Sequence, residues 1–192
     1  MRKLIMKMSI SLDGFVSGPN GKNDWIFRSS DEESREWVLQ SSRQAGLFIM
    51  GRKSFETMSP YWPTATGPLA DVMNETPKAV FTQNGFKVPA AVSSSPAAAS
   101  WAEARVTDGD LAERISQLKQ EPGKPILAFG GAGFMRSLIA TGLIDEYNLV
   151  IHPTVLGGGL PIFTSPAKPF DLKLIASKAF PGGVVVHTYQ PA

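Results

Sequence analysis

Gly51-Arg52-Lys53-Ser54 follows the apolar run "LFIM" and brings together a glycine, two cations and a hydroxyl. The apolar run predicts a buried strand, and the residues after it predict the start of a helix. Free N–H groups and the positive end of the helix dipole favour a phosphate there. Arg52 can fork onto a phosphate, while Lys53 adds charge and Ser54 a donor. The alternative is that both cations are solvated first-turn residues, although cations at a helix start oppose the dipole.

A second glycine cluster lies in "ILAFGGAGFMRSL", where Gly130, Gly131, Ala132 and Gly133 separate an apolar run from a predicted helix. Such a turn lets a pyrophosphate lie against bare backbone. The spacing is not G-x-G-x-x-G, and no acidic residue follows at the distance of about 20 residues that a Rossmann fingerprint requires. Glycines that only permit tight strand–helix packing are the alternative. Two such sites in one chain nevertheless suit an elongated ligand with separated phosphates, such as a dinucleotide.

Three carboxylates are candidates for acid–base chemistry. Asp31 and Glu32 open the segment "DEESREWVLQSS", which predicts a helix capped by Ser30. A carboxylate there could assist protonation of a substrate, but acidic residues are also favoured in any first helical turn. Asp13, in "SLDG", is the third candidate and could equally form an Asx turn.

The hydrophobic pattern shows which elements must position these groups. Strands are predicted at residues 3–11, 47–50, 78–82, 125–129 and 146–152, and helices at 31–42, 108–120 and 134–142. This alternation predicts a mostly parallel sheet with helices on both faces. Residues 170–180 and 184–189 flank Pro181-Gly182-Gly183 and predict a closing antiparallel hairpin. Loops are predicted at 15–25 and at two Pro/Gly-rich stretches, 59–77 and 157–169.

Composition limits the classes of protein that the chain can represent. Its 192 residues, 43% of them hydrophobic, predict a single domain over 1–192. Its 19 basic and 17 acidic residues form no basic cluster, so no nucleic-acid partner is expected. No apolar run approaches the roughly 20 residues of a membrane span, and no signal-peptide pattern is present, so we expect a cytoplasmic protein without a membrane partner. With no cysteine and only His152 and His187 as histidines, we expect no thiolate chemistry and no metal site.

Four stretches together resemble the dihydrofolate-reductase-like superfamily. They are "MSISLDGFVSG", "FIMGRKSFETM", "KAVFT" and "FGGAGFMRSLIATGLIDEYNLVIHPTVLGGGLPIF". The chain is most similar to stand-alone relatives of the reductase domain in the bifunctional riboflavin-biosynthesis deaminase/reductase, over nearly its whole length and most specifically from Gly142 to Phe163. The resemblance implies an α/β fold with a central mixed, mostly parallel sheet of about eight strands flanked by helices. It also implies NADPH bound across the strand ends. A deaminase half would need a zinc signature with cysteines, so bifunctionality is excluded.

The same resemblance implies roles for individual residues. In the phosphate-binding turn from Gly51 to Ser54, Arg52 would meet the 2′-phosphate and Ser54 the pyrophosphate. Further cofactor-binding positions are Lys53 in that turn, Thr82 and Gln83 beside the adenosine, Gly130, Gly131, Ala132, Gly133, Phe134 and Met135 under the pyrophosphate, and Ser9, Val16 and Gly18 beside the nicotinamide. Asp31 lies near the acid of folate reductases, although the spacing differs, and Asp13 matches the riboflavin-type reductases better. Asp24 and Trp25 are predicted to line the substrate pocket, with a lid anchor as the alternative for Trp25.

These observations predict an NADPH-dependent reductase that acts on a small heterocycle or a ribosylamino- or ribitylamino-pyrimidine, as in riboflavin biosynthesis. A dihydrofolate reductase is the alternative enzyme, and a non-catalytic NADPH-binding module is the alternative of another class. Substrate-dependent oxidation of NADPH separates the enzymes from the module. Apolar residues around three glycines in 154–163 further predict a two-fold homodimer; they are Val155, Leu156, Leu160, Ile162 and Phe163.

Overall fold

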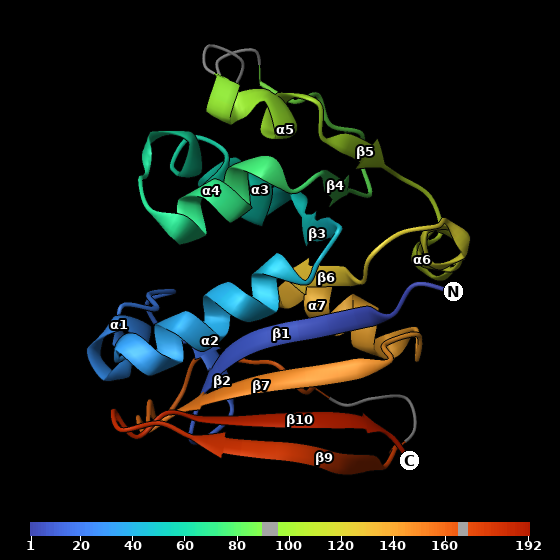
Figure 1. The fold of residues 1–192 in the computed structure, drawn as a ribbon. Coiled ribbons are helices and arrows are strands. Elements are labelled where there is room, and N and C mark those ends of the chain that lie inside the picture. Colours follow the sequence, from blue (N-terminus) through green and yellow to red (C-terminus); the bar gives the residue numbers. More distant parts are fainter. Residues whose placement is uncertain (90–95, 165–168) are drawn as a thin grey trace.

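An eight-stranded sheet in the order β5-β4-β3-β6-β1-β7-β10-β9 forms the centre of the computed structural model, which describes residues 1–89, 96–164 and 169–192 (Figure 1). Its strands are β1 (Leu4–Ser11), β3 (Leu47–Gly51), β4 (Lys78–Phe81), β5 (Arg105–Thr107), β6 (Ile126–Phe129), β7 (Glu146–His152), β9 (Leu172–Ala179) and β10 (Val185–Pro191). All pairs from β5 to β7 are parallel, whereas β10 runs antiparallel to β7 and β9. The predicted mixed, mostly parallel sheet and its closing hairpin are therefore confirmed.

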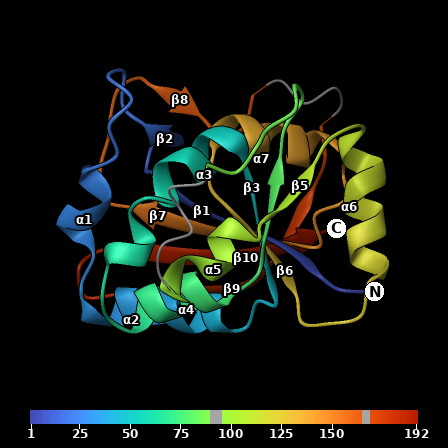
Figure 2. The ribbon, with the colours of Figure 1, turned by 90° about the horizontal axis from the view of Figure 1, so that it is seen from above.

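Helices cover both faces of the sheet (Figures 1 and 2). They are α1 (Trp25–Ser29), α2 (Glu32–Arg43), α3 (Arg52–Met58), α4 (Pro68–Glu75), α5 (Ala99–Ala102), α6 (Leu111–Gln120) and α7 (Ala132–Ala140), with 3-10 turns at Trp62–Thr64 and Pro96–Ala98. Residues of α2 to α5 share one apolar core, and residues of α6 and α7 share the other. No helix within the described ranges combines the length and apolarity needed to cross a bilayer.

Strand β3 shows why the apolar runs of this sequence become central strands. Phe48 and Met50 pack into the core of α2 to α5, while Leu47 and Ile49 pack into the core of α6 and α7. Because successive side chains of a strand point to opposite faces, a run without polar residues fits only a strand that is covered on both sides. The run ends at Gly51, where the buried part of the strand ends and α3 begins.

The start of α2 corrects one predicted boundary. Asp31, rather than Ser30, is the N-cap residue, because its side chain accepts the backbone N–H of Ser34 at 2.7 Å. The hydroxyl of Ser34 in turn accepts the backbone N–H of Asp31 at 3.0 Å, which completes a capping box. Ser30, the residue after α1, instead donates its hydroxyl to the carbonyl of Ile26 in the first turn of that helix.

The loop predicted for 59–77 is wrong, because this stretch contains α4 and a 3-10 turn. Pro68 stands in the first turn of α4, where its missing N–H does no harm, and Val72 and Met73 are buried beneath the helix. The other two predicted loops, 15–25 and 157–169, each contain a short strand. These strands, β2 (Phe15–Ser17) and β8 (Leu160–Pro161), pair with each other. Residues 165–168 of the second loop lie outside the described residues. The elements α5 and β5 had no predicted counterpart.

Candidate functional site

The carboxyl ends of six parallel strands lie along one edge of the sheet, where α/β folds commonly bind ligands. Most of the predicted cofactor residues lie at this edge. Ser9 is near the end of β1, residues 51–54 follow β3, Thr82 and Gln83 follow β4, and the glycine turn 130–133 follows β6. The fold thus brings together residues that are more than 100 positions apart in the chain.

The starts of α3 and α7 touch each other at this edge, as Figure 2 shows from above. A Cβ on Gly51 would lie 2.9 Å from Cβ of Phe134, and a Cβ on Gly131 would lie 2.8 Å from Oγ of Ser54. Gly130 and Gly131 both have positive φ, a conformation that L-residues rarely adopt. The ring of Phe134 stacks on Phe81 with centroids 5.2 Å apart. The two glycine-bearing turns therefore pack against each other and form one surface, in which half-buried glycine backbone lies beside the Ser54 hydroxyl.

The cations beside this surface are accessible. Arg52 and Lys53 are exposed, and Nε of Arg52 lies 3.7 Å from Oε1 of Glu56, one helical turn along. An exposed ion pair of this kind contributes little, about 0.3–0.5 kcal/mol, so it leaves the guanidinium free to bind an anion. On the next strand, Thr82 is half-buried and donates its backbone N–H to the carbonyl of Thr107 at 3.0 Å, whereas Gln83 is exposed. Glycine backbone, a hydroxyl and exposed cations fit the phosphates of a dinucleotide.

The residues predicted beside the nicotinamide differ in what they offer. Ser9 is half-buried on β1. The side chain of Val16 is buried in the core of α6 and α7, so any ligand contact would involve its backbone. Gly18 is also buried, and its N–H donates to the carbonyl of Lys22 within the loop that follows β2.

Asp13 joins two loops at the same edge. It accepts the Ser11 hydroxyl at 2.6 Å and the backbone N–H groups of Leu156 and Gly157 in the loop after β7, the latter at 2.8 Å. The hydrogen bond from Ser11, helped by those from Gly157 and Leu156, lowers the pKa of Asp13. At neutral pH this carboxylate is an acceptor that fixes the loop, and its predicted catalytic role remains a prediction.

Both carboxylate oxygens of Asp31 likewise accept hydrogen bonds from backbone N–H groups. Besides capping α2, it accepts the backbone N–H of Gly182 from the turn between β9 and β10. The hydrogen bonds from the backbone of Ser34 and then of Gly182 lower the pKa of Asp31. A carboxylate whose pKa is lowered is a poor proton donor at neutral pH. Its catalytic role likewise remains a prediction, and the observed contacts favour a structural one.

The predicted substrate residues Asp24 and Trp25 are in contrasting environments. Asp24 is exposed and makes no side-chain cap at the start of α1, whereas Trp25 is only 2% exposed. The indole of Trp25 packs edge-on against His152, with centroids 5.3 Å apart. His152 in turn shares a hydrogen bond of 2.8 Å with the hydroxyl of Ser29, and burial lowers the pKa of His152 to about 4.

Sequence reasoning missed His152 and Ser29 as members of this site. His152 ends a strand and lies in register beside Ser11 at the end of β1. A polar residue at the carboxyl end of a predicted parallel strand is the signal that could have singled it out. Its partner Ser29 is 123 positions away, and no spacing rule joins the two.

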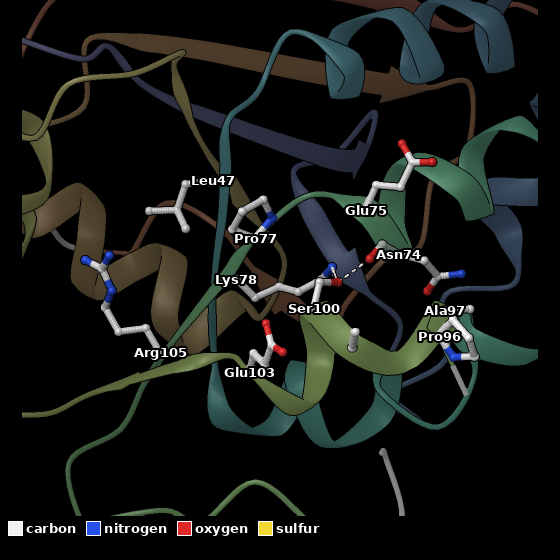
Figure 3. A pocket seen from close by; sticks show the side chains of 11 residues that line it. Leu47, Asn74, Glu75, Pro77, Lys78, Pro96, Ala97, Ser100, Glu103 and Arg105 are labelled. Carbon is white, nitrogen blue, oxygen red and sulfur yellow. Dashed lines mark hydrogen bonds between the residues drawn. The ribbon is translucent and has the colours of Figure 1, made fainter. Parts of the chain in front are cut away.

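A hollow at the opposite edge of the sheet involves none of the predicted site residues (Figure 3). It lies at the amino ends of β4 and β5, where Lys78 donates to the Thr76 carbonyl and to the Ser100 hydroxyl. The Ser100 hydroxyl donates to the carbonyl of Asn74 in the last turn of α4. Burial lowers the pKa of Lys78 to about 7. These contacts satisfy carbonyls at the end of α4 and give Lys78 a structural role.

The sheet order, the hairpin and the glycine-lined edge define a protein of dihydrofolate-reductase-like fold. The chain belongs to the RibD C-terminal domain family, whose model matches residues 2–186. The resemblance read from the sequence is thereby confirmed. The family and the fold are those of reductases, which supports an oxidoreductase.

Similar proteins span the same length. The uncharacterized protein YyaP of Bacillus subtilis (strain 168) is 32% identical over 194 residues, which cover 98% of this chain and 95% of YyaP. A putative riboflavin biosynthesis protein from Shewanella sp. PV-4 has a TM-score of 0.77 at 20% identity over 100% of this chain and 99% of its own. Dihydrofolate reductase from Enterococcus faecalis, solved with NADP(H), has a TM-score of 0.63 at 12% identity over 98% of this chain and 96% of its own. At these identities the two structures show a shared fold.

Proposed function

We propose that the chain is an NADPH-dependent reductase of a small heterocycle, of the kind represented by ribosylamino- and ribitylamino-pyrimidines in riboflavin biosynthesis. The observation that carries the proposal is the contact between Ser54 and the Gly130-Gly131 turn, with Arg52 exposed beside it. This surface offers a pyrophosphate bare backbone and a hydroxyl, and offers a 2′-phosphate a guanidinium. The family and the likeness to a reductase that holds NADP(H) support the same cofactor.

In this proposal each group of residues serves one part of the cofactor. Thr82 and Gln83 flank the adenosine, Arg52 and Lys53 bind the 2′-phosphate, and Ser54 together with residues 130–135 binds the pyrophosphate. Neighbouring strands are about 4.8 Å apart, so the three steps from β4 through β3 and β6 to β1 span about 14 Å. A dinucleotide laid along this edge places its nicotinamide at β1, beside Ser9 and Gly18. The bound cofactor supplies the hydride, and the protein aligns the acceptor with it.

A riboflavin-type substrate is preferred to dihydrofolate because of the environment of Asp31. A folate reductase needs a carboxylate that is free to recognise the pterin, and both oxygens of Asp31 already accept backbone N–H groups. An accessory role in the assembly of the site falls to Asp13, which fixes the loop after β7.

Consumption of NADPH tests the proposal. The purified protein is expected to oxidise NADPH when an aminouracil that bears a ribosylamino group is added, and to show little activity with dihydrofolate. NADH should support a lower rate at equal concentration. An absence of NADPH binding by calorimetry would sink the proposal, and binding without turnover of either substrate would support the non-catalytic module instead.

We further propose that the enzyme is a two-fold homodimer. Val155, Leu160 and Phe163 are 69%, 39% and 42% exposed, which is more apolar surface than a loop commonly presents to water. Ile162 is fully buried in its own core and Leu156 is half-buried, so the candidate contact patch is smaller than the sequence predicts.

A further inference from the structure

His152 is held from one side by a single short helix. It is the last residue of β7 and is only 1% exposed. Its Nδ1 shares a hydrogen bond with Oγ of Ser29, and its ring meets the indole of Trp25 at an angle of 86°. Trp25 and Ser29 are the first and last residues of α1, and Trp25 is the only fully buried residue of that helix. The first and last residues of α1 therefore both contact this one imidazole.

The second ring nitrogen of His152 and the single indole nitrogen of Trp25 have no hydrogen-bond partner. In the part of the chain that the structure describes, only two buried side-chain polar atoms lack a hydrogen bond, and they are Nε2 of His152 and Nε1 of Trp25. Buried polar groups are almost always paired, so each exception calls for an explanation. Here both exceptions fall in one pair of packed rings, which points to a common polar partner.

The position of this pair matches the substrate side of the proposed reductase. His152 lies in register beside Ser11 and shares a face of the sheet with Val150, which packs with Trp37 of α2. Strand β1 separates β7 from the glycine turn that follows β6. Two strand spacings, about 10 Å, separate β7 from β6 across the sheet, and His152 lies further along the strand direction than the turn, because Phe129 is opposite Lys7 and His152 is opposite Ser11. A nicotinamide at the end of β1 would have the glycine turn on one side and His152 on the other.

We propose that Nε2 of His152 and the indole N–H of Trp25 form the recognition point for a ring carbonyl of the substrate, so that the enzyme selects a heterocycle with a lactam group. This assignment rests on the proposed reductase function and names the substrate chemistry of the same site. Trp25 can only donate, so it requires an acceptor. If Ser29 donates to Nδ1, then Nε2 also donates, and both N–H groups converge on one carbonyl oxygen. If Nδ1 donates to Ser29, Nε2 accepts, and the pair complements the C=O and N–H of a lactam.

The surroundings favour this neutral mode of recognition over a carboxylate. Burial keeps the imidazole uncharged at neutral pH, since the pKa of His152 is lowered to about 4. Asp31, the nearest acid in a folate-type arrangement, is occupied by Ser34 and Gly182. Both nitrogens are buried beneath α1, so binding of a lactam requires a local rearrangement there that keeps Trp25 beside His152.

Nuclear magnetic resonance of ¹⁵N-labelled protein tests the assignment directly. The chain has four tryptophans and two histidines, so Trp25→Phe and His152→Gln identify the two signals. The probes are 5,6-diaminouracil, lumazine and pterin, which all carry a ring lactam, and 2,4,6-triaminopyrimidine, which carries none. We expect at least one lactam probe to shift the Trp25 indole and His152 ring signals, with the His187 signal unchanged. No shift with any lactam probe, or the same shift with triaminopyrimidine, overturns the assignment.

Binding of the shifting probe supplies the second readout. Trp25→Phe keeps an aromatic ring and removes only the N–H, and it should weaken probe binding by about tenfold, as expected for one lost hydrogen bond. His187→Gln, on β10 outside the site, is the matched control and should bind the probe normally. NADPH affinity, measured in the same samples, separates the two proposals. If Trp25→Phe binds both NADPH and the probe as tightly as the parent does, the recognition point is wrong and the reductase proposal stands. If the parent protein does not bind NADPH, the reductase proposal is wrong. The probe titration is also carried out without NADPH. Its result therefore tests the recognition point whether or not the protein binds NADPH.

Discussion

Oγ of Ser54 lies 2.8 Å from the position that a Cβ on Gly131 would occupy, so the turn after β3 and the turn after β6 form one surface. No residue with a side chain fits at Gly131 without moving Ser54. The fold therefore requires a glycine at this position. The same glycine leaves its backbone uncovered by a side chain of its own, beside a hydroxyl at the proposed pyrophosphate site.

Replacement of Gly131 should be costly for stability. Its φ of 84° disfavours a Cβ by about 1–2 kcal/mol, and the contact with Ser54 adds to that cost. Gly131→Ala is therefore expected to lower the free energy of unfolding, measured with urea, by at least this amount. Gly133→Ala is the matched control two residues on. Gly133 is helical with open space around it, so its change to alanine should stabilise by about 0.5–1 kcal/mol. Equal effects of the two variants would contradict the role given to the turn.

Arg52 should determine the preference for NADPH over NADH. Loss of one charge-assisted contact with the 2′-phosphate is worth about 1.5–3 kcal/mol, so Arg52→Ala should weaken NADPH binding by roughly 10- to 100-fold and leave NADH binding nearly unchanged. Isothermal calorimetry measures both. Glu56→Gln removes only the exposed ion pair of Arg52 and should preserve or strengthen NADPH binding. An Arg52→Ala protein that keeps the preference for NADPH would remove Arg52 from the site.

The sequence predicts those parts of the fold that depend on neighbouring residues. The strand 47–50 and the glycine turn at 130–133 are read correctly because an apolar run covered on both faces, or a cluster of glycines, is visible within a short window. Helix α4 is not predicted, since its Pro/Gly-rich flanks resemble a loop and the burial of Val72 and Met73 is decided by tertiary packing.

In the candidate site, too, features set by neighbouring residues can be predicted from sequence, whereas contacts between distant residues cannot. From the sequence, Asp31 is a candidate proton donor. Its second hydrogen-bond partner, Gly182, lies 151 positions away and is visible only in the structure. His152 reads as one residue of a strand, because its partner Ser29 comes from a helix that follows a different strand. Glycine turns at strand ends can be predicted from sequence, whereas arrangements defined by pairs of distant side chains require the structure.

Asp31→Asn should affect stability more than chemistry. The ionised carboxylate accepts N–H groups from Ser34 and Gly182, and the amide that replaces it is a weaker acceptor. We expect a lower melting temperature for the variant at neutral pH, with NADPH affinity unchanged. Because the pKa of Asp31 is lowered in the folded state, its contribution is present above the ordinary pKa of about 3.9 and is lost as the pH falls through the folded value. The melting temperatures of variant and parent should therefore converge in acid. Strong dihydrofolate turnover by the parent that Asp31→Asn abolishes would instead support the folate-type role.

Lys7 should make stability depend on pH in the alkaline range. It is buried on β1, with Nζ 3.2 Å from Oγ of Ser42 and 4.6 Å from the ring centroid of Phe129. Burial lowers its pKa to about 7, whereas an unfolded lysine titrates near 10.4. Between these values the unfolded chain binds more protons than the folded one, so stability rises with pH by up to about 1.4 kcal/mol per unit.

Lys7→Met isolates this effect. Ser42 donates its hydroxyl to the carbonyl of Val38, so the substitution leaves that donor paired. Urea unfolding at two pH values, about 7 and about 9.5, compares the parent with the variant. We expect the variant to be the more stable protein near neutral pH and its advantage to shrink at the higher pH. The buried Lys78 acts in the same direction in both proteins and cancels in the difference. A constant difference would show that Lys7 does not change its protonation on unfolding.

The exposed apolar residues after β7 are expected to decide assembly. Val155, Leu160 and Phe163 lie in 154–163, a segment that Asp13 ties to the end of β1 and β8 ties to β2. Because both ends of the segment are fixed, the side chains cannot retract into the core, and a second copy related by a two-fold axis would bury them against themselves.

Light scattering after size exclusion should therefore give twice the 20.7 kDa of one chain at micromolar concentration. Leu160→Asp and Phe163→Asp should shift the mass towards the monomer, while Leu174→Asp, which changes an exposed apolar residue of β9, should not. A parent mass near 20.7 kDa would reject the dimer, and a dimer that only Leu174→Asp disrupts would move the interface to the free edge of the sheet.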